Sequence, residues 1–302
     1  MITVAGEALI DLVVDRSQAV TAHPGGGPFN AARIAGMLGA PCRFLGRFGD
    51  DAFGRRLRGE LERVHVEVAA GEPTRAPTTL AIVEVDSDGT ARYTFHLEGT
   101  SAAQLSPQDL VPGALADATA IATGGLALVA QPTASTLLGL FAQAPPAAML
   151  VLDPNCRPSA ISDPARYPAA VRRFVAHADI VKCSVEDLRV LDPLVEPHAA
   201  AHGLLALGPR AVLVTDGPAP IWIYTPGEER DVSVEPVSVI DTVGAGDAFL
   251  AGLLVWLTQR EVAREQAGDA DTLAEAAAAA ARVAGAACTV PGANLPDTFE
   301  WG

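Results

Sequence analysis

Asp241–Phe249 reads DTVGAGDAF, which places two glycines and a small residue in a turn directly before an amphipathic helix. Backbone N–H groups at such a turn and helix start attract anions, phosphate above all. An acid is unusual beside a phosphate because like charges repel, so Asp247 is better explained as a group that takes a proton. We therefore predict an anion cradle at Gly244, Ala245 and Gly246 with Asp247 as a base. This arrangement suits transfer of a phosphoryl group to a hydroxyl.

The size and charge of the chain limit its class. Its 302 residues are 49% hydrophobic, which is enough for one large α/β domain, and we treat residues 1–302 as a single domain with a small appendage. The formal net charge of −15 argues against nucleic acid or an anionic membrane as a partner, since both reward basic patches. The start, MITVAG, lacks the basic and apolar regions of a signal peptide, and no apolar run is long enough to span a bilayer. We expect a cytoplasmic protein.

The positions of the cysteines and of the single lysine limit the possible kinds of site. The cysteines are far apart and form no CxxC pair, so we expect reduced structural thiols rather than a metal site or a disulfide framework at Cys42, Cys156, Cys183 and Cys288. Lys182 is the only lysine among 21 basic residues. Lysine is a compact movable charge whereas arginine is a rigid fork. Lys182 is therefore either a functional cation or a chance residue at a strand end.

Short apolar runs alternate with helical stretches along most of the chain. The runs read as buried strands because each ends near Gly, Asp or Thr: Ile2–Ala5, Cys42–Arg47, Ala120–Thr123, Met149–Asp153, Asp179–Lys182 and Ala211–Thr215. The helical stretches between them are Phe29–Leu38, Phe53–Arg63, Thr133–Gln143, Ala165–Ala176 and Val185–Leu191. This alternation is typical of a doubly wound α/β fold, in which a mostly parallel sheet is flanked by helices and ligands bind beyond the carboxyl ends of the strands.

Two segments, Ala8–Val20 and Thr79–Leu97, alternate polar and apolar residues instead. The second contains a strong hairpin turn signal at Asp86–Gly89. We expect the two segments to form a small antiparallel sheet that protrudes from the main domain; the alternative is an extra edge of the main sheet. Near the C-terminus, Thr272–Ala287 is alanine-rich and should form a helix that allows close approach of a neighbour.

A second glycine-rich stretch lies at Pro24–Ala32, where three consecutive glycines let a ligand approach the backbone closely. Asn30, early in the following helix, can donate and accept hydrogen bonds, as a hydroxyl-rich substrate requires. The stretch lacks the G-x-G-x-x-G fingerprint of dinucleotide-binding folds, which disfavours a dehydrogenase. The alternative for this stretch is a flexible surface loop.

Polar residues also follow strands in the second half of the predicted sheet. In Asp153–Pro158, Arg157 can reach an anionic oxygen and Asn155 a hydroxyl or a metal-bound water, although a capped turn explains the stretch equally well. Lys182–Leu188 and Val214–Gly217 follow the next two strands. The motif G-x-x-x-x-G-K-[ST] is missing from the sequence, which excludes a P-loop enzyme.

Taken together, these motifs resemble the ribokinase/PfkB family of carbohydrate kinases. Gly25–Ala32 is similar to the family's first signature, GG-x-x-x-N, and Asp241–Phe249 to its second, D-T-x-G-A-G-D-x-F. The blocks between them match in order and spacing, as does Gly292-Ala293, so the resemblance covers essentially the whole chain. Three blocks are most similar to bacterial fructokinases and 2-keto-3-deoxygluconate kinases, namely Asp153–Arg157, Lys182–Leu188 and Glu98–Thr100.

The resemblance implies a role for each motif. Asp247 would be the catalytic base, and Gly244, Ala245 and Gly246 would form an anion hole that also borders the nucleotide. The other substrate contacts would come from Asp11, Gly26, Gly27 and Asn30 on the sugar hydroxyls, from the lid residues Tyr93 and Phe95, and from Arg157. The nucleotide would lie by Lys182, Ser184, Thr215 and Gly217. The segments Ala8–Val20 and Thr79–Leu97 would form a lid over the sugar.

ATP and Mg²⁺ would be the cofactors. K⁺ is a further candidate, because Asp241 and the carbonyl of Val243 match a monovalent-cation site found in many relatives. One departure concerns the magnesium side. Ser184 reads as a helix N-cap with Asp187 at the third helical position, and relatives usually carry Glu where Asp187 falls. Because Asp is one methylene shorter, Glu186 is the alternative for a water-mediated hold on Mg²⁺.

The expected activity is transfer of the γ-phosphoryl group of ATP to the primary hydroxyl of a monosaccharide. Fructose is the first choice, with 2-keto-3-deoxygluconate, ribose or a nucleoside as alternatives. A keto-acid sugar would need a cation such as Arg92 or Arg157 for its carboxylate. A sugar-sensing protein without catalysis would have a damaged Gly244–Asp247 run, whereas this run is intact. Relatives often dimerise through their lids, so a homodimer is a further expectation.

Overall fold

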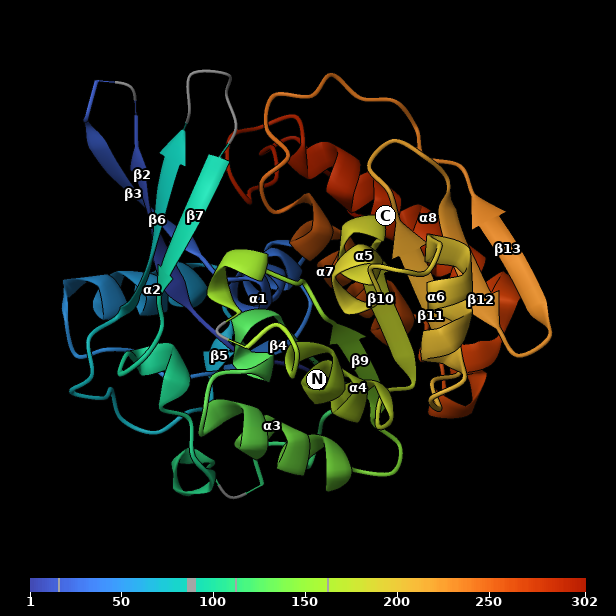
Figure 1. Cartoon of the computed structure of the whole chain (residues 1–302), viewed down its shortest axis with the longest axis horizontal. Coiled ribbons are helices and arrows are strands. Elements are labelled where there is room, and N and C mark those ends of the chain that lie inside the picture. The colour runs from blue at the N-terminus through green and yellow to red at the C-terminus, as the bar shows by residue number, and fades with distance from the viewer. Residues whose placement is uncertain (16, 86–90, 112, 162) are drawn as a thin grey trace.

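A computed structural model describes residues 1–15, 17–85, 91–111, 113–161 and 163–302. Its main sheet has nine strands: β1 (Ile2–Ala5), β4 (Cys42–Leu45), β5 (Glu67–Val68), β8 (Ala120–Gly124), β9 (Met149–Asp153), β10 (Ile180–Ser184), β11 (Ala211–Thr215), β12 (Ile221–Thr225) and β13 (Glu228–Val232). Their order is β13-β12-β11-β10-β9-β8-β1-β4-β5. Figure 1 labels the part of this sheet from β9 to β13. The strands from β11 to β5 in this order are parallel, and β12 and β13 add an antiparallel hairpin at one edge.

Helices cover both faces of this sheet. One layer contains α1 (Gly27–Met37), α2 (Ala52–Arg63), α7 (Ala245–Gln259) and α8 (Ala270–Ala287). The other contains α3 (Thr133–Ala142), α4 (Tyr167–Val175), α5 (Val185–Leu191) and α6 (Pro197–Leu205). Along β11, Ala211 and Leu213 face the first layer while Val212 and Val214 face the second, so the strand is buried on both sides. Short 3-10 helices lie at Ser101–Ala103, Pro107–Asp109, Gly125–Leu128, Pro158–Ala160 and Arg264–Gly268.

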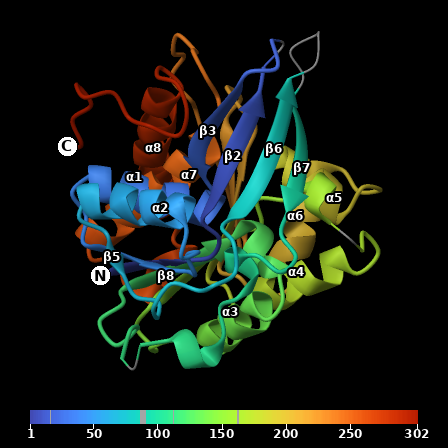
Figure 2. The ribbon, with the colours of Figure 1, turned by 90° about the vertical axis from the view of Figure 1, so that its left-hand side faces the viewer.

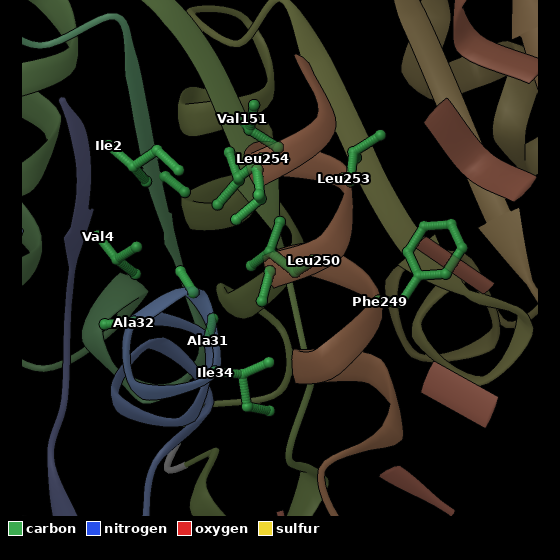
Figure 3. Packing of buried hydrophobic residues seen from close by; sticks show 14 of the residues in the cluster. Ile2, Val4, Ala31, Ala32, Ile34, Val151, Phe249, Leu250, Leu253 and Leu254 are labelled. Atoms are coloured by element: carbon green, nitrogen blue, oxygen red, sulfur yellow. The ribbon is translucent and has the colours of Figure 1, made fainter. Parts of the chain in front are cut away.

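Small residues allow the first helical layer to pack closely. Figure 3 shows Leu250 of α7 in the same buried cluster as Ile34 of α1. A Cβ atom at Gly252 of α7 would come within 2.9 Å of the Cα of Ala280, so α7 and α8 are in contact backbone to backbone. The alanine-rich helix predicted over Thr272–Ala287 is thereby confirmed as α8, and it carries the close approach expected of it.

A separate four-stranded sheet stands out from the main body as the lid (Figure 2). Its strands are β2 (Leu9–Val14), β3 (Val20–Gly25), β6 (Thr79–Val85) and β7 (Ala91–His96), in the order β3-β2-β6-β7. The predicted lid is confirmed with two corrections. The central pair, β2 and β6, is parallel, so the sheet is mixed rather than antiparallel. The first segment also continues past Val20 through β3, which leads directly into the glycine stretch before α1. The predicted turn at Asp86–Gly89 lies outside the described residues.

The predicted main-sheet elements agree with the structure to within a few residues. β10 begins after Asp179 and continues to Ser184, β4 ends at Leu45 rather than Arg47, and α4 begins at Tyr167. The prediction omitted α6, the two-residue strand β5 and the β12–β13 hairpin. In the part of the chain that the structure describes, no helix combines the length and the apolar character needed to cross a membrane.

Candidate active site

The candidate site lies at the carboxyl ends of β1, β8 and β9, below the lid. β1 pairs with β4 on one side and β8 on the other, so the strand order reverses there. In open α/β sheets the crevice at such a reversal is the usual place for a ligand. Glu7 follows β1, Gly125 follows β8 and Asn155 follows β9. Glu7 and Asn155 line one hollow at this point, and Gly125 and Asn155 line a second one beside it.

Asp247 is the centre of the site. It lies in the first turn of α7 and is 7% exposed. Asn30 of α1 donates from Nδ2 to its Oδ2 at 2.9 Å, and Asn155 donates from Nδ2 to its Oδ1 at 3.2 Å. Burial raises the pKa of Asp247, while the hydrogen bond from Asn30 and the charge of Arg157 oppose the shift. A carboxylate that is oriented by two amides and made more basic by burial is suited to accept a proton.

The glycine turn before α7 has the shape expected of an anion cradle. Gly244 has a φ of +79°, the left-handed region that favours glycine, and a Cβ atom there would clash with Ala293. The carboxylate of Asp241 braces the turn, because its Oδ1 accepts the N–H of Val243 at 3.0 Å and its Oδ2 accepts that of Gly292 at 2.8 Å. The sequence prediction included Asp241 and Val243 as cation ligands, and the structure places both in this bracing network.

Ala245 and Gly246 form the first turn of α7, where helix N–H groups generally lack partners within the helix. The N–H of Ala245 donates to the carbonyl of Thr242 at 3.2 Å. A Cβ atom at Gly246 would lie 3.1 Å from Nζ of Lys182, so the single lysine of the chain lies beside the start of α7.

Lys182 is buried and paired. Its Nζ lies 2.8 Å from Oδ2 of Asp153, and the two side chains are 4% and 3% exposed. The carboxylates of Asp153, Asp187 and Asp247 outweigh desolvation and raise the pKa of Lys182. Burial raises the pKa of Asp153 to about 6. The structure thus places the Lys182 charge beneath the cradle in a buried ion pair, rather than at an exposed strand end.

A pocket above Asp247 brings together all eight residues that were predicted to contact the sugar. Its lining consists of Glu7, Leu9, Asp11, Gly26, Gly27, Asn30, Tyr93, Phe95, Leu126, Asn155, Arg157, Val243, Gly244 and Asp247. Besides Gly244, glycine is needed at two further points of this lining. A Cβ atom at Gly27 would clash with the amide of Asn155, and one at Gly26, where φ is +105°, would lie 2.7 Å from the carbonyl oxygen of Glu7.

Two of the acids in the pocket are strongly perturbed. Burial raises the pKa of Asp11 to about 6, with the nearby charge of Arg157 opposing the shift. Glu7 is 2% exposed, and burial raises its pKa to about 7 against hydrogen bonds from the backbone, including the N–H of Ala127 at 3.1 Å. Sequence reasoning missed Glu7 and Leu126. A signal was available for Glu7, an acid two residues after the apolar strand β1.

The lid contributes two aromatic rings to the pocket. Tyr93 and Phe95 alternate with outward-facing residues along β7, and their rings stack with centroids 5.9 Å apart and an interplanar angle of 11°. Both line the pocket, and Phe95 also packs with Leu9 and Leu126. Arg157 is exposed at the rim, where its Nη1 donates to the carbonyl of Cys156 at 3.1 Å.

On the side of the site that was predicted to hold Mg²⁺, Asp187 is part of a helix cap. Ser184 and Asp187 form a capping box at the start of α5, and Oδ2 of Asp187 accepts hydrogen bonds from the N–H and the hydroxyl of Ser184. Its Oδ1 accepts the N–H of Cys156 at 2.6 Å. Asp187 is 5% exposed whereas Glu186 is exposed to solvent. The carboxylate of Asp187 is thus already engaged by three protein donors.

A second, largely apolar pocket of about 350 Å³ lies on the other side of the glycine turn. The predicted nucleotide residues Thr215 and Gly217 border it, together with Gly246. Most of the lining was not predicted. It comes from the segment before the turn and from the end of α8 with the residue that follows it, and includes Val237, Val239, Ala281, Ala284 and Cys288. A flat base could be held here by apolar contact, with its phosphates directed toward the start of α7.

The acidic side chains near the cradle fit a metal ion whose ligands are mainly water molecules and substrate phosphates. Over the described ranges, no three His, Cys, Asp or Glu side chains are arranged to hold a metal ion. Mg²⁺ keeps several waters and is usually bound through one or two carboxylates plus substrate phosphates. The acids near the cradle, Asp153 and Asp187, fit a role in which they support a phosphate-bound ion from beyond its own ligands.

Comparisons with known proteins agree with this geometry. The model of the pfkB family of carbohydrate kinases matches residues 1–299. A fructokinase of Rhizobium leguminosarum bv. trifolii is 34% identical over 273 residues, covering 87% of this chain and 83% of that protein.

Solved structures are similar over nearly the whole chain. A fructokinase from Xylella fastidiosa with bound ATP has a TM-score of 0.87 at 25% identity, covering 97% of this chain and 93% of that one. A double-mutant fructokinase from Vibrio cholerae O395 in fructose-, ADP- and potassium-bound form has a TM-score of 0.84 at 28% identity, with the same coverage of 97% and 93%.

Proposed function

This chain belongs to the pfkB family of carbohydrate kinases, and we propose that it transfers the γ-phosphoryl group of ATP to the primary hydroxyl of fructose. The observation that carries the proposal is the setting of Asp247. Asn30 and Asn155 orient its carboxylate at the floor of the polar pocket, and the glycine turn Gly244–Gly246 directly precedes it. A base and an anion cradle thereby meet where a hydroxyl-bearing substrate can enter.

In the proposed reaction, the hydroxyl lies between Asp247 and the γ-phosphate. The carboxylate of Asp247 accepts the proton while the hydroxyl oxygen bonds to phosphorus in line, and the bond from phosphorus to the departing ADP oxygen breaks. The N–H groups of Gly244–Gly246 and the dipole of α7 stabilise the charge on the transferring group. Arg157 adds positive charge near the reacting groups, and the ammonium group of Lys182, paired with Asp153, lies beside the start of α7. Mg²⁺, which Asp187 or Glu186 would hold through water, would offset the negative charge of the ATP phosphates.

The charges around the pocket favour a neutral sugar over 2-keto-3-deoxygluconate. Glu7, Asp11 and Asp247 line the pocket, and Arg157 is the single arginine among its described lining residues. The carboxylate of a keto-acid sugar would face three acids, and an unpaired charge in a buried site is costly. A neutral ketose needs only hydrogen-bond donors and acceptors, which these side chains and Asn30 supply. The fructose-bound relative from Vibrio cholerae supports the same choice.

The remaining contacts are proposed from the same arrangement. Asp11, Gly26 and Gly27 would face the sugar hydroxyls, while Tyr93 and Phe95 cover the sugar from the lid. The nucleotide would extend from the turn toward Thr215, Gly217 and the apolar pocket. For K⁺, the support is the braced loop at Asp241 together with the potassium-bound relative. Asp187 and Glu186 remain proposals for a water-mediated hold on Mg²⁺.

A coupled ADP-release assay tests the activity. The protein is supplied with Mg-ATP and, in separate reactions, fructose, 2-keto-3-deoxygluconate, ribose or adenosine, with and without K⁺. We expect the highest kcat/KM with fructose and a higher rate when K⁺ is present. A higher kcat/KM with the keto-acid sugar would overturn the charge argument, and release of ADP that does not depend on any sugar would overturn the kinase assignment.

We also propose a homodimer through the lid. The four-stranded lid has β3 and β7 as its edges within the described residues, and unpaired strand edges are templates for pairing with a second copy. Light scattering coupled to size exclusion should give twice the 31.1 kDa chain mass, and a monomer mass would overturn this proposal. We further propose a cytoplasmic location, where ATP is available and the four free cysteines stay reduced.

A further inference from the structure

Arg33 is a buried arginine that the proposed reaction does not use. It lies in α1 and is 8% exposed. Its Nη1 donates to Oδ1 of Asn294 at 2.9 Å, and its Nη2 donates to the carbonyl oxygen of Ala293. Both acceptors are uncharged. A buried guanidinium that is held by neutral oxygens loses hydration without gaining a full counter-charge, so its presence requires a positional explanation.

The turn that Arg33 holds is in contact with the anion cradle. Ala293 occupies the space where a side chain at Gly244 would lie, so the two backbones are closely packed. One residue earlier, the N–H of Gly292 donates to Asp241, whose other carboxylate oxygen accepts the N–H of Val243. The turn at residues 292–294 is therefore fixed to α1 at one end and to the loop before α7 at the other.

The same helix also orients the proposed base. Asn30 lies three residues before Arg33 in α1, and residues with this spacing share one face of a helix. Asn30 is hydrogen-bonded to Asp247, while Arg33 reaches the cradle through Ala293 and Asn294. Because α1 and α7 also pack against each other in one buried cluster, α1 provides a common frame for the base and the cradle.

We propose that Arg33 is a positioning residue for phosphoryl transfer, which holds the 292–294 turn against Gly244 and so fixes the N–H groups of Gly244–Gly246 relative to Asp247. The proposal rests on the proposed kinase function of this site. The position of these N–H groups affects the rate because donors that stabilise a transition state act only when they are already in place. A misplacement of about 1 Å can lower the rate by on the order of 10²-fold.

The first test compares Arg33→Met with Arg43→Met. Arg43 is an apt control because it is also 8% exposed, but it binds the carbonyl of Ala114 and the carboxylate of Asp117 near the amino ends of the strands, away from the site. Both variants are assayed at a temperature where circular dichroism shows them folded. We expect Arg33→Met to lower kcat by at least about tenfold, with KM for fructose within about threefold of wild type. Arg43→Met should lose stability and keep the wild-type kcat.

Two further measurements separate positioning from general stability. Asn294→Ala should also lower kcat, and its effect should not add to that of Arg33→Met in the double variant, since both remove the same contact. Arg33→Lys, which keeps the charge but not the fork that reaches two oxygens, should recover only part of the rate. A kcat for Arg33→Met no lower than that of Arg43→Met, or fully additive losses, would overturn the proposal.

Hydrogen exchange tests the proposal without relying on the reaction. Backbone amides in residues 241–247 should exchange faster in Arg33→Met than in wild type, and at the wild-type rate in Arg43→Met. If wild type phosphorylates no sugar in the assay, the proposed function fails, whereas the exchange result still decides whether Arg33 holds the cradle. Unchanged exchange in residues 241–247 of Arg33→Met would overturn the positioning role.

Discussion

At the scale of single residues, the proposed base gives the clearest prediction. Asp247→Asn retains a side chain of similar shape between Asn30 and Asn155, but the amide cannot accept the proton of the sugar hydroxyl. Loss of a general base typically costs about 10²–10⁴ in rate, so kcat should fall by at least about that factor. Thermal unfolding and nucleotide binding should remain close to wild type. Steady-state kinetics with fructose check this, and a variant that kept more than about a tenth of wild-type kcat would exclude Asp247 as the base.

The residues that could be predicted were those with a local signature. Asp247 and the glycines around it stand in a recognisable turn-and-helix pattern, and Asn30 follows a glycine run. Asn155 was expected to meet a ligand, but its contact with Asp247 depends on β9 lying near β1 in the sheet, which the sequence does not state. The sequence also left open whether Lys182 is a functional cation or a chance residue at a strand end. Its partner, Asp153, is far away in the sequence and lies on the strand that neighbours β10 in the sheet.

At the scale of elements, the lid carries the second prediction. Tyr93 and Phe95 cover the pocket from β7, and a lid that excludes water suppresses hydrolysis of ATP in place of transfer to the sugar. Replacing both rings with alanine should raise the ratio of ATP hydrolysis to sugar phosphorylation. Thr94→Ala is the matched control, since Thr94 lies between them on the exposed face. In each variant the ratio is obtained by measuring ADP release and sugar phosphate formation. An equal ratio in the double variant and in Thr94→Ala would show that the two rings do not exclude water from the site.

The lid also shows why element pairing was harder to predict than element type. Alternating polar and apolar residues indicated strands in both segments, and the strands are present. The period of two is the same for parallel and antiparallel pairs, so it could not reveal that β2 and β6 are parallel. In the omitted β12–β13 hairpin, β12 has an apolar strand sequence, IWIYT, and only β13 lacks a signal of its own. β13, with the sequence EERDV, has little apolar content, and its pairing with β12 supplies the order that its composition does not.

At the scale of the whole molecule, the doubly wound architecture followed from the regular alternation of strands and helices, since parallel strands need crossover helices. The position of the site relative to that architecture was also predictable in outline, because its motifs follow strand ends. The order of the strands was not. It places β1 between β4 and β8 and thereby gathers Glu7, Gly125 and Asn155 at one crevice.

The acids gathered at this crevice make the stability of the whole molecule depend on pH. Burial raises the pKa of Glu7 from 4.5 to about 7, and those of Asp11 and Asp153 from 3.8 to about 6. The folded state therefore binds these protons more tightly than the unfolded state. Their contribution to stability is fully present below the unfolded pKa values and is lost as the pH rises through the folded ones. The free energy of unfolding in urea should accordingly fall between about pH 5 and about pH 8.

A variant isolates the contribution of the most perturbed group. Glu7→Gln cannot ionise, so its free energy of unfolding should fall less steeply over this pH range than that of wild type. The exposed Glu62 of α2 provides the control, and Glu62→Gln should keep the wild-type slope. The general repulsion expected of a chain with a net charge of −15 affects both variants alike, because each removes one carboxylate. Parallel slopes for Glu7→Gln and Glu62→Gln would show that Glu7 is ionised throughout this range and that its burial does not hold a proton.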